Sequence, residues 1–488
     1  MTENYDLIVI GGGSAGLVAA GGSAILGAKV ALIEKNALGG DCLYTGCVPS
    51  KTLIKSARFA HDANGAEKYG FQPLAPKFLG DSFAGITDRV QNVIGIIEHH
   101  DAPEVFEKMG VEVIFGSPTF LGPNEIEVTL KETGEKRLMK SRRFCISTGS
   151  APFVPPIDGL KGAGVITNEE VFHLKELPKR LIVLGGGPIG LELGQAFSRF
   201  GSKVTVVEMG DRILGNEDDE VSRLMQKLLA DEGIEFLINH KAVKARKNDD
   251  GVKVLTLETD GKSFEIEADE ILVAAGRQPN LEGLGLDKAG VKYDKKRIET
   301  NETLQTSQKH IFAAGDVTGH FQFTHMADYE AQIVIQNAFV PFLFRKKTDF
   351  RTVPWTTFTS PEVAHVGMTE IDARGKFGDG IRIYRVKFTE NDRAQAESST
   401  DGFAKVVTYK SRIIGTTLVG EHVGELIHEF VWAVKRRMKI ADLNQIIRVY
   451  PTLAKITQAV ATEATLESLR SPFVQTLFGR YLKFWRFF

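Results

Sequence analysis

A strand–turn–helix unit that occurs twice constrains the fold of this chain more than any other feature. Residues 5–17 read YDLIVIGGGSAGL and residues 179–191 read KRLIVLGGGPIGL. In both copies a short apolar strand runs into Gly-x-Gly-x-x-Gly and a helix, and a second strand ends in an acid 23 residues after the first glycine. The duplication predicts an α/β fold with two Rossmann-like dinucleotide-binding domains.

The chemistry of such a unit depends on its glycines and its acid. The glycines let backbone N–H groups approach a pyrophosphate at a helix N-terminus, and the acid accepts a hydrogen bond from a ribose hydroxyl. The predicted binding residues are Gly11, Gly13, Gly16 and Glu34 in the first copy and Gly185, Gly187, Gly190 and Glu208 in the second. Two such sites suit a flavin and a nicotinamide.

The second acid also bears on the choice of nicotinamide. Glu208 would bind a ribose 2′-hydroxyl and repel a 2′-phosphate, which favours NADH. Arg212 could compensate for a phosphate, so NADPH stays as the second choice.

Composition excludes several classes of protein. Lys and Arg total 60 against 62 Asp and Glu, which argues against a nucleic-acid-binding body. Three cysteines cannot form a disulfide framework, and no apolar run approaches the ~18 residues of a membrane span. The N-terminus enters a strand at Asp6 with no leader pattern, so we expect a cytoplasmic protein.

The reactive centre is predicted in GGDCLYTGCVPSK, residues 39–51. Cys42 and Cys47 are separated by four residues, and Pro49 and Ser50 are typical of a helix start. A helix N-terminus stabilises a thiolate through its dipole and its free N–H groups. A buried inert pair and half of a zinc site are the alternatives, although no second Cys or His pair has matching spacing. Cys145 stands alone in an apolar strand and is expected in the core.

These motifs, with AAGD (313–316) and PWTTFTSPEVAHVG (354–367), resemble the flavin-dependent pyridine nucleotide–disulfide oxidoreductases over roughly residues 5–465. The resemblance implies FAD on the first unit, NAD(P)H on the second and a homodimer formed through a C-terminal α+β domain. The boundaries that follow are 1–150 for the FAD-binding domain (completed by 276–348), 151–275 for the NAD(P)-binding domain, 349–465 for the dimerisation domain and 466–488 for a tail.

The resemblance also implies residue roles. Cys47 would lie against the flavin as the charge-transfer thiolate, and Cys42 would attack the acceptor. Lys51 would approach the flavin and pair with Glu192, and Asp316 would bind the ribityl chain. NADH would reduce FAD, FAD would reduce the Cys42–Cys47 disulfide, and the dithiol would reduce an acceptor. The other implied cofactor-binding residues are Ser14, Lys35, Gly40, Thr148, Gly149, Gly276 and Gly315.

One stretch departs from the family pattern. Disulfide reductases carry a His-Pro motif followed by a Glu, whereas VYPTLAK (449–455) has Tyr450 and Lys455 at those positions. A tyrosine with a pKa near ~10 is a poor base at neutral pH, although it can donate a proton. Tyr450 therefore counts against dihydrolipoyl dehydrogenase and glutathione reductase activity. The lack of any cysteine after Cys145 counts against efficient mercury reduction.

The leading hypothesis is thus a homodimeric FAD enzyme of redox homeostasis, resembling mercuric reductase, that passes electrons from NADH through Cys42 and Cys47 to a disulfide, metal ion, quinone or other electrophile. A dihydrolipoyl dehydrogenase with Tyr450 as its catalytic acid is one alternative. A redox sensor or partner-binding flavoprotein without turnover is another.

Two further features are predicted outside the redox centre. Residues 470–488 contain four basic residues, seven aromatics and no acid, which suits a membrane surface, a partner groove or an arm packed on its own dimer. His422, Glu425 and His428 fall near one helical face, where dimer packing is favoured over a metal site. We therefore predict no metal ligands. His325 is expected either to approach the flavin or to be structural.

Overall fold

A computed structural model describes residues 3–487 and divides them into two compact units. The first unit comprises the chain up to Asn64 together with Pro73–Met209 and Gly233–Asp349. The second comprises Gly65–Gln72, Gly210–Glu232 and the chain from Phe350. The finer domain boundaries given above stay a prediction.

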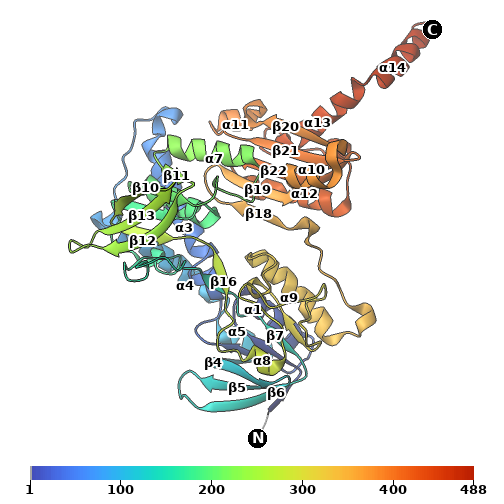
Figure 1. Ribbon diagram of the computed structural model, residues 1–488. Coiled ribbons are helices and arrows are strands. Elements are labelled where there is room, and N and C mark those ends of the chain that lie inside the picture. The colour runs from blue at the N-terminus through green and yellow to red at the C-terminus, as the bar shows by residue number, and fades with distance from the viewer. Residues whose placement is uncertain (1–2, 488) are drawn as a thin grey trace. The chain divides into compact units, whose positions relative to one another are not determined.

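The first unit contains an eight-stranded sheet that carries the first glycine-rich turn (Figure 1). Across the sheet the strands are β1 (Glu3–Tyr5), β6 (Lys136–Ser141), β5 (Glu125–Leu130), β4 (Val111–Gly122), β3 (Val30–Glu34), β2 (Leu7–Ile10), β7 (Phe144–Ile146) and β17 (Ile311–Ala313). Strands β4, β3, β2, β7 and β17 are parallel, whereas β4, β5 and β6 form an antiparallel meander. Every residue of β2 is buried, as expected for a parallel strand covered on both faces.

Helices pack on this sheet and bury its hydrophobic side chains. Helices α1 (Ser14–Ile25) and α9 (Thr324–Phe339) pack against each other and share one hydrophobic cluster with β2 and β3. A second cluster includes α8 (Leu286–Ala289) and the alternate residues of the same strands. The remaining helices of this part are α2 (Gly40–Tyr44), α3 (Cys47–Asn64), α4 (Ala84–Glu98) and α5 (Pro103–Lys108).

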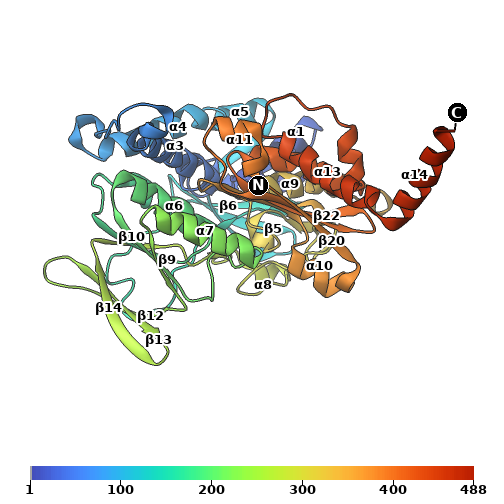
Figure 2. The same ribbon diagram turned by 90° about the horizontal axis from the view of Figure 1, so that it is seen from above.

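The second glycine-rich turn belongs to a separate parallel sheet of the first unit. Its strands are β11 (Glu235–Ile238), β10 (Lys203–Glu208), β9 (Arg180–Leu184) and β15 (Glu270–Val273). Helix α6 (Pro188–Phe200) packs on β9 and β10, as Figure 2 shows. Smaller antiparallel sheets are formed by β12 (Lys241–Lys247), β13 (Lys253–Thr259) and β14 (Lys262–Ala268), and by β8 (Ser150–Pro152) with β16 (Arg277–Pro279).

The second unit is built on a five-stranded antiparallel sheet. In order its strands are β18 (Pro354–Thr357), β19 (Glu362–Gly367), β22 (Arg412–Gly420), β21 (Phe403–Tyr409) and β20 (Ile381–Lys387). Its helices are α7 (Asp219–Asp231), α10 (Glu370–Phe377), α11 (Asp392–Ala396), α12 (Val423–Arg436), α13 (Lys455–Leu469) and α14 (Pro472–Trp485). The α/β class with a C-terminal α+β part is therefore confirmed. Within residues 3–487, no helix combines the length and the apolar character needed to cross a bilayer.

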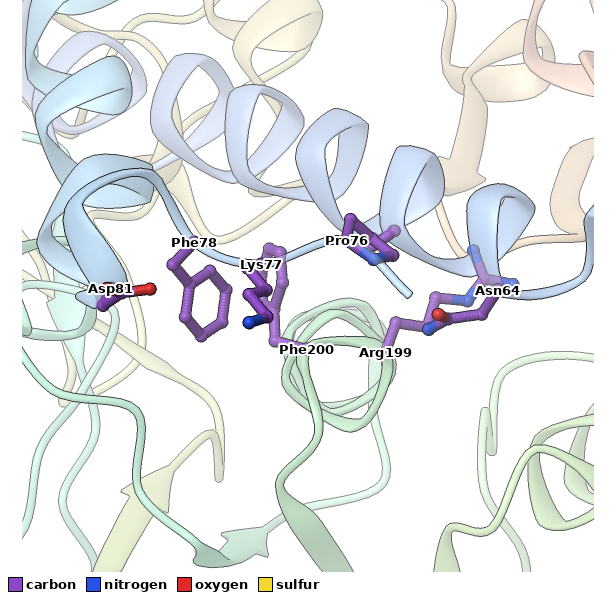
Figure 3. Close-up of a pocket in the computed structure, with 8 residues that line it drawn as sticks. Asn64, Pro76, Lys77, Phe78, Asp81, Arg199 and Phe200 are labelled. Carbon is purple, nitrogen blue, oxygen red and sulfur yellow. The ribbon is translucent and has the colours of Figure 1, made fainter. Parts of the chain in front are cut away.

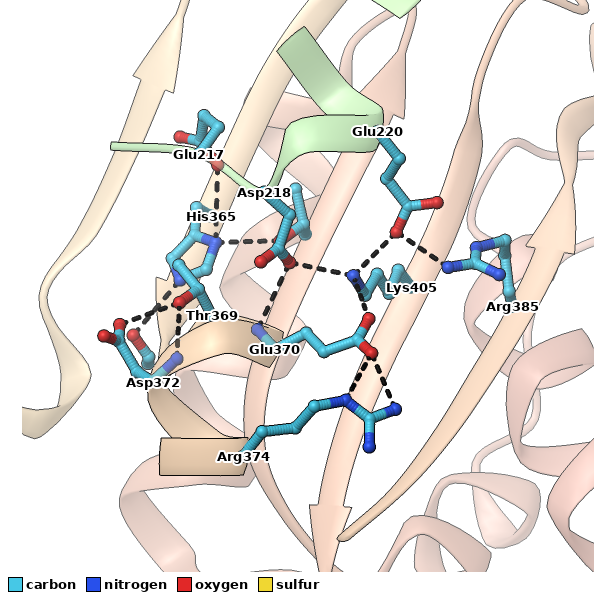
Figure 4. A network of polar contacts seen from close by, with 12 residues as sticks. Glu217, Asp218, Glu220, His365, Thr369, Glu370, Asp372, Arg374, Arg385 and Lys405 are labelled. Carbon is cyan, nitrogen blue, oxygen red and sulfur yellow. Dashed lines mark hydrogen bonds and ion pairs between the residues drawn. The ribbon is translucent and has the colours of Figure 1, made fainter. Parts of the chain in front are cut away.

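A buried lysine organises the polar interior of the second unit (Figure 4). The side chain of Lys405 on β21 is 1% exposed, and its ammonium lies 2.8 Å from Asp218, 2.6 Å from Glu220 and 2.7 Å from Glu370. Burial opposes ionisation of Asp218, but the Lys405 ammonium and backbone N–H groups lower its pKa overall. Among the described residues, these three acids are the group whose spacing could hold a metal ion. Here they compensate the charge of a lysine.

Candidate functional site

The two predicted redox cysteines lie on two consecutive helices of the first unit. Cys42 belongs to α2 and is partly buried, whereas Cys47 is the first residue of α3 and is exposed; both are free thiols. The sequence placed the helix start at Pro49 and Ser50, and the structure moves it back to Cys47. The sulfur of Cys47 thus stands at a helix N-terminus, where the dipole favours negative charge.

The two thiols have opposite acidities. A hydrogen bond from Cys42 is the main cause that lowers the pKa of Cys47 to about 6, with burial opposing and Thr324 and Lys51 assisting. The same hydrogen bond and burial raise the pKa of Cys42 well above its ordinary value. At neutral pH the pair therefore holds one thiolate, on Cys47, and one thiol, on Cys42.

Thr324 is a contributor that the sequence analysis missed. It is the first residue of α9, and its Oγ1 lies 3.2 Å from the Cys47 sulfur. The adjacent His325, which had been considered, instead stacks on Phe323 with ring centroids 5.3 Å apart. The only sequence indication of Thr324 was its position just after the AAGD strand.

Lys51 and Glu192, which the sequence analysis paired, form an ion pair. The Lys51 ammonium on α3 lies 2.9 Å from the Glu192 carboxylate on α6. The Glu192 side chain is 7% exposed and that of Lys51 is 37% exposed. A carboxylate this buried needs a cationic partner, so the pair fixes α3 against α6 one helical turn beyond Cys47.

The glycine-rich turns have matching geometry that requires their first and third glycines. Gly11 and Gly185 have φ of 103° and 117°, in the region that favours glycine. A Cβ on Gly16 would lie 1.8 Å from the Gly11 carbonyl oxygen, and one on Gly190 would lie 2.1 Å from that of Gly185. These glycines let each helix start directly against its strand.

The middle glycines leave room for a ligand. A Cβ on Gly187 would meet nothing within 4 Å, and one on Gly13 would meet only the Gly40 Cα at 3.8 Å. Neither residue caps its helix with a side chain, so the first N–H groups of α1 and α6 are available to an anion. This open space before an uncapped helix N-terminus fits the pyrophosphate of a dinucleotide.

Glu34 and Glu208, predicted to bind ribose hydroxyls, also make hydrogen bonds within the protein. The Gly12 N–H donates to Glu34 Oε2 and the Gly186 N–H donates to Glu208 Oε2, both at 2.7 Å. Each acid therefore holds its own glycine-rich turn in shape as well as standing at the end of its second strand.

Asp316 has a cationic neighbour that the sequence analysis also missed. Ser150 Oγ donates to Asp316 at 2.6 Å, and Arg277 Nε donates to the same Ser150 at 2.7 Å. Arg277 also lies 3.1 Å from Asp41, which precedes Cys42 on α2. Burial raises the pKa of Asp316, with the Ser150 hydrogen bond and Arg277 opposing. The sequence predicted the neighbouring Gly276 as a cofactor-binding residue but did not indicate Arg277.

The other predicted cofactor-binding residues surround these turns in the first unit. Ser14 opens α1, Lys35 is exposed after β3, and Gly40, Gly149 and Gly276 have φ of 61°, 67° and 121°. Thr148 Oγ1 donates to the Asn280 carbonyl oxygen at 2.8 Å. The Gly315 N–H donates to the buried carboxylate of Glu330 at 2.7 Å, a partner that the sequence analysis did not identify. Burial raises the pKa of Cys145 to about 12, as expected for a core thiol.

Tyr450 belongs to the second unit, where its side chain is held by a hydrogen bond. It is 65% exposed, and its hydroxyl donates to Asp392 Oδ2 at 2.8 Å. That hydrogen bond and the Asp392 charge raise the pKa of Tyr450. Lys455 begins α13 and donates to Gln458 at 2.5 Å. A tyrosine with a raised pKa is a poor base at neutral pH.

A pocket of about 340 Å³ opens between the ends of α3 and α6 in the first unit (Figure 3). Asn64, Phe78, Arg199 and Phe200 are among its lining residues, and the rings of Phe78 and Phe200 are 6.1 Å apart. None of the predicted site residues lines it, so the redox centre lies elsewhere.

Comparison with known proteins gives matches over nearly the whole chain. The model of the pyridine nucleotide-disulphide oxidoreductases matches residues 5–331, and that of their dimerisation domain matches residues 353–461. Mercuric reductase of Staphylococcus aureus is 35% identical over 93% of this chain and 81% of its own length. Dihydrolipoyl dehydrogenase of Bacillus subtilis (strain 168) is 33% identical over 95% of this chain and 98% of its own length. A Cu(II) complex of the HOCl-induced flavoprotein disulfide reductase RclA from Escherichia coli has a TM-score of 0.82 at 27% identity, covering 95% of this chain and 99% of that one.

Proposed function

Because this chain belongs to the pyridine nucleotide-disulphide oxidoreductase family, we propose that it uses NADH to reduce a thiophilic metal ion, with Cu(II) as the test case, through Cys42 and Cys47. The family is FAD-dependent with NAD(H) as its nucleotide substrate, and the chain is an NAD(P)H-dependent oxidoreductase. Its dimerisation domain supports a homodimer.

The choice of a metal ion as the acceptor rests on the hydrogen bond and the raised pKa of Tyr450. Reducing a disulfide releases a thiolate, and a positioned acid that gives it a proton accelerates that step. Tyr450 stands where the family's disulfide reductases place a histidine, but its proton is held by Asp392 and its pKa is raised. A metal ion that accepts electrons releases no thiol, so its reduction needs no such acid. Replacing the histidine by Tyr450 therefore slows the reduction of a metal ion less than it slows the reduction of a disulfide.

The cysteine pair supplies suitable donors. The Cys47 thiolate and the Cys42 sulfur are soft ligands of the kind that copper selects. Two Cu(II) ions would each take one electron and become Cu(I), one S–S bond would form between Cys42 and Cys47, and the Cys42 proton would leave to solvent. Two electrons from NADH, with one proton, would return the pair to thiol and thiolate.

The residues that would hold the cofactors are those of the two glycine-rich turns. Gly13 would face the pyrophosphate of FAD, and Gly187 that of NADH. Bound FAD supplies the two-electron carrier between nicotinamide and disulfide. The Lys51–Glu192 pair would balance charge beside it, and Glu208 would favour NADH over NADPH.

The similar proteins support this proposal at two points. One relative is a mercuric reductase, and a similar solved structure is a Cu(II) complex. A mercury substrate is less favoured here because residues 146–488 contain no cysteine that could deliver the ion.

The test is NADH consumption by the purified FAD-loaded protein with Cu(II), with Cu(I) formation followed by a chromogenic chelator. Cys42→Ser is expected to lower the rate at least ~100-fold, because a disulfide can no longer form. Cys145→Ser, the matched control in the core, should stay within about two-fold of wild type.

Turnover with lipoamide, a disulfide substrate, tests the alternative function. Turnover with lipoamide that exceeds turnover with Cu(II), and that falls in Tyr450→Phe, would identify a dihydrolipoyl dehydrogenase and refute the metal proposal. Stoichiometric reduction by NADH without steady-state turnover on any acceptor would identify a sensor and refute it as well.

A further inference from the structure

We infer that α14 is an amphipathic anchor that binds the surface of an anionic lipid bilayer, and that it acts independently of the proposed acceptor. This helix, Pro472–Trp485, follows α13 after a short break and has no buried residue. Figure 1 shows it running out from α13, away from the sheet of the second unit. Within the described residues, α14 is thus a helix whose large apolar side chains are mostly exposed.

The apolar residues of α14 form one broad face. At 3.6 residues per turn, Phe473, Leu477, Tyr481 and Phe484 follow one side, and Val474, Phe478 and Trp485 lie next to them. The exposed fractions are 77% for Phe473, 57% for Tyr481 and 64% for Trp485. So many large exposed side chains on one face mark a surface that binds something apolar.

The polar face carries only positive charge. Lys483 and Arg486 fall on the side opposite the aromatic face and Arg480 lies at its edge, and residues 470–488 contain no Asp or Glu. Basic residues on the polar face with Trp, Phe and Leu on the other are typical of helices that lie in a membrane interface. The side chains of Trp485 and Tyr481 add the amphipathic rings that prefer the headgroup level.

The length of α14 favours lying on the bilayer over crossing it. Fourteen residues span about 21 Å at ~1.5 Å per residue, short of the ~30 Å hydrocarbon core. A second copy of α14 offers no acid that could pair with Arg480, Lys483 and Arg486, whereas the headgroups of an anionic lipid supply that opposite charge. Charge complementarity therefore favours anionic lipid over a second copy of this chain as the occupant.

The experiment uses the full-length FAD-loaded protein and vesicles of phosphatidylcholine alone or mixed with phosphatidylglycerol. Sedimentation should show binding to the anionic vesicles that is weakened by salt. Each basic residue near an anionic surface contributes about five-fold to partitioning, so the combined R480Q, K483Q and R486Q variant should bind about 100-fold more weakly. Neutralising the exposed Lys292, Lys295 and Lys296 in the first unit is the matched control and should change binding less than about five-fold.

A second variant tests the contribution of the apolar face to vesicle binding separately from that of charge. Phe478→Glu should abolish vesicle binding while NADH turnover in solution stays as in wild type, because α14 contains none of the proposed redox residues. Equal binding by wild type and by a chain truncated after Ser471 would overturn the inference, as would no binding by wild type. It would also fall if truncation converted a dimer into monomers, because α14 would then be covered by a second copy.

Discussion

Replacing Cys42 by alanine is expected to raise the pKa of Cys47, because the Cys42 hydrogen bond is the largest cause of its acidity. The ordinary thiol value is 9.0 and the value in this site is about 6. At pH 7 a thiol with a pKa near 6 is about nine-tenths ionised, whereas one near 9 is about one-hundredth ionised. The thiolate forms above the pKa and is lost as the pH falls through it.

Two substitutions at Cys42 separate the hydrogen bond from the loss of the sulfur. Cys42→Ser keeps an O–H donor, so the Cys47 midpoint should stay near 6. Cys42→Ala removes the donor, so the midpoint should move up by at least about one pH unit. Thr324→Val should produce a smaller rise, since its hydrogen bond is a lesser cause.

The measurement is the pH dependence of alkylation of the reduced, FAD-loaded protein, with the site of modification identified by mass spectrometry. Cys145 is 0% exposed and its pKa is raised to about 12, so it stays unmodified and serves as an internal control. A midpoint near 9 in Cys42→Ser, or the same midpoint in the serine and alanine variants, would refute the assignment of the thiolate and its cause.

Three further outcomes follow from the structure. Lys405→Met should destabilise the protein by about 3–5 kcal/mol in denaturant unfolding, because three carboxylates lose their buried counter-charge, while the exposed Lys387→Met should change stability little. Glu208→Gln should narrow the preference for NADH over NADPH at least ~10-fold in kcat/KM, because the repulsion of a 2′-phosphate is lost; an unchanged ratio would show that Glu208 does not select the nucleotide. Gly187→Ala should weaken NADH binding in titrations without lowering Tm, whereas Gly190→Ala should lower Tm, because only the second methyl meets a protein atom.

The features that the sequence predicted best are those fixed by local conformation. The turn at Gly185 requires a positive φ and the close approach of Gly190, and both requirements are visible as glycines at a fixed spacing. The duplication of the unit made the parallel strands of both sheets predictable in the same way. The start of α3 was predicted at Pro49 and Ser50, whereas the helix begins at Cys47.

Contacts between residues far apart in the chain could not be predicted from spacing. Thr324 is 277 positions from Cys47, and nothing in the local sequence indicates that a hydroxyl would reach the thiol. Lys405 lies in GFAKVVTY, where a lysine on a strand would ordinarily face solvent. Its burial is explained by the carboxylates around its ammonium, which come from Asp218 just before α7, Glu220 on α7 and Glu370 on α10.

The residues proposed for electron input and the residue that bears on the choice of acceptor belong to different units of the chain. The glycine-rich turns, the thiols and the Lys51–Glu192 pair, which would serve electron input, all belong to the first unit. The residue that departs from the disulfide reductases, Tyr450, belongs to the second, where Asp392 holds its hydroxyl. A substitution there alters proton delivery to a leaving thiol without disturbing the residues that would accept electrons from NADH. Tyr450→His should therefore raise lipoamide turnover while leaving NADH-dependent reduction of the Cys42–Cys47 disulfide unchanged in stopped-flow measurements. A loss of that reduction in the variant would show that the two functions are not separable.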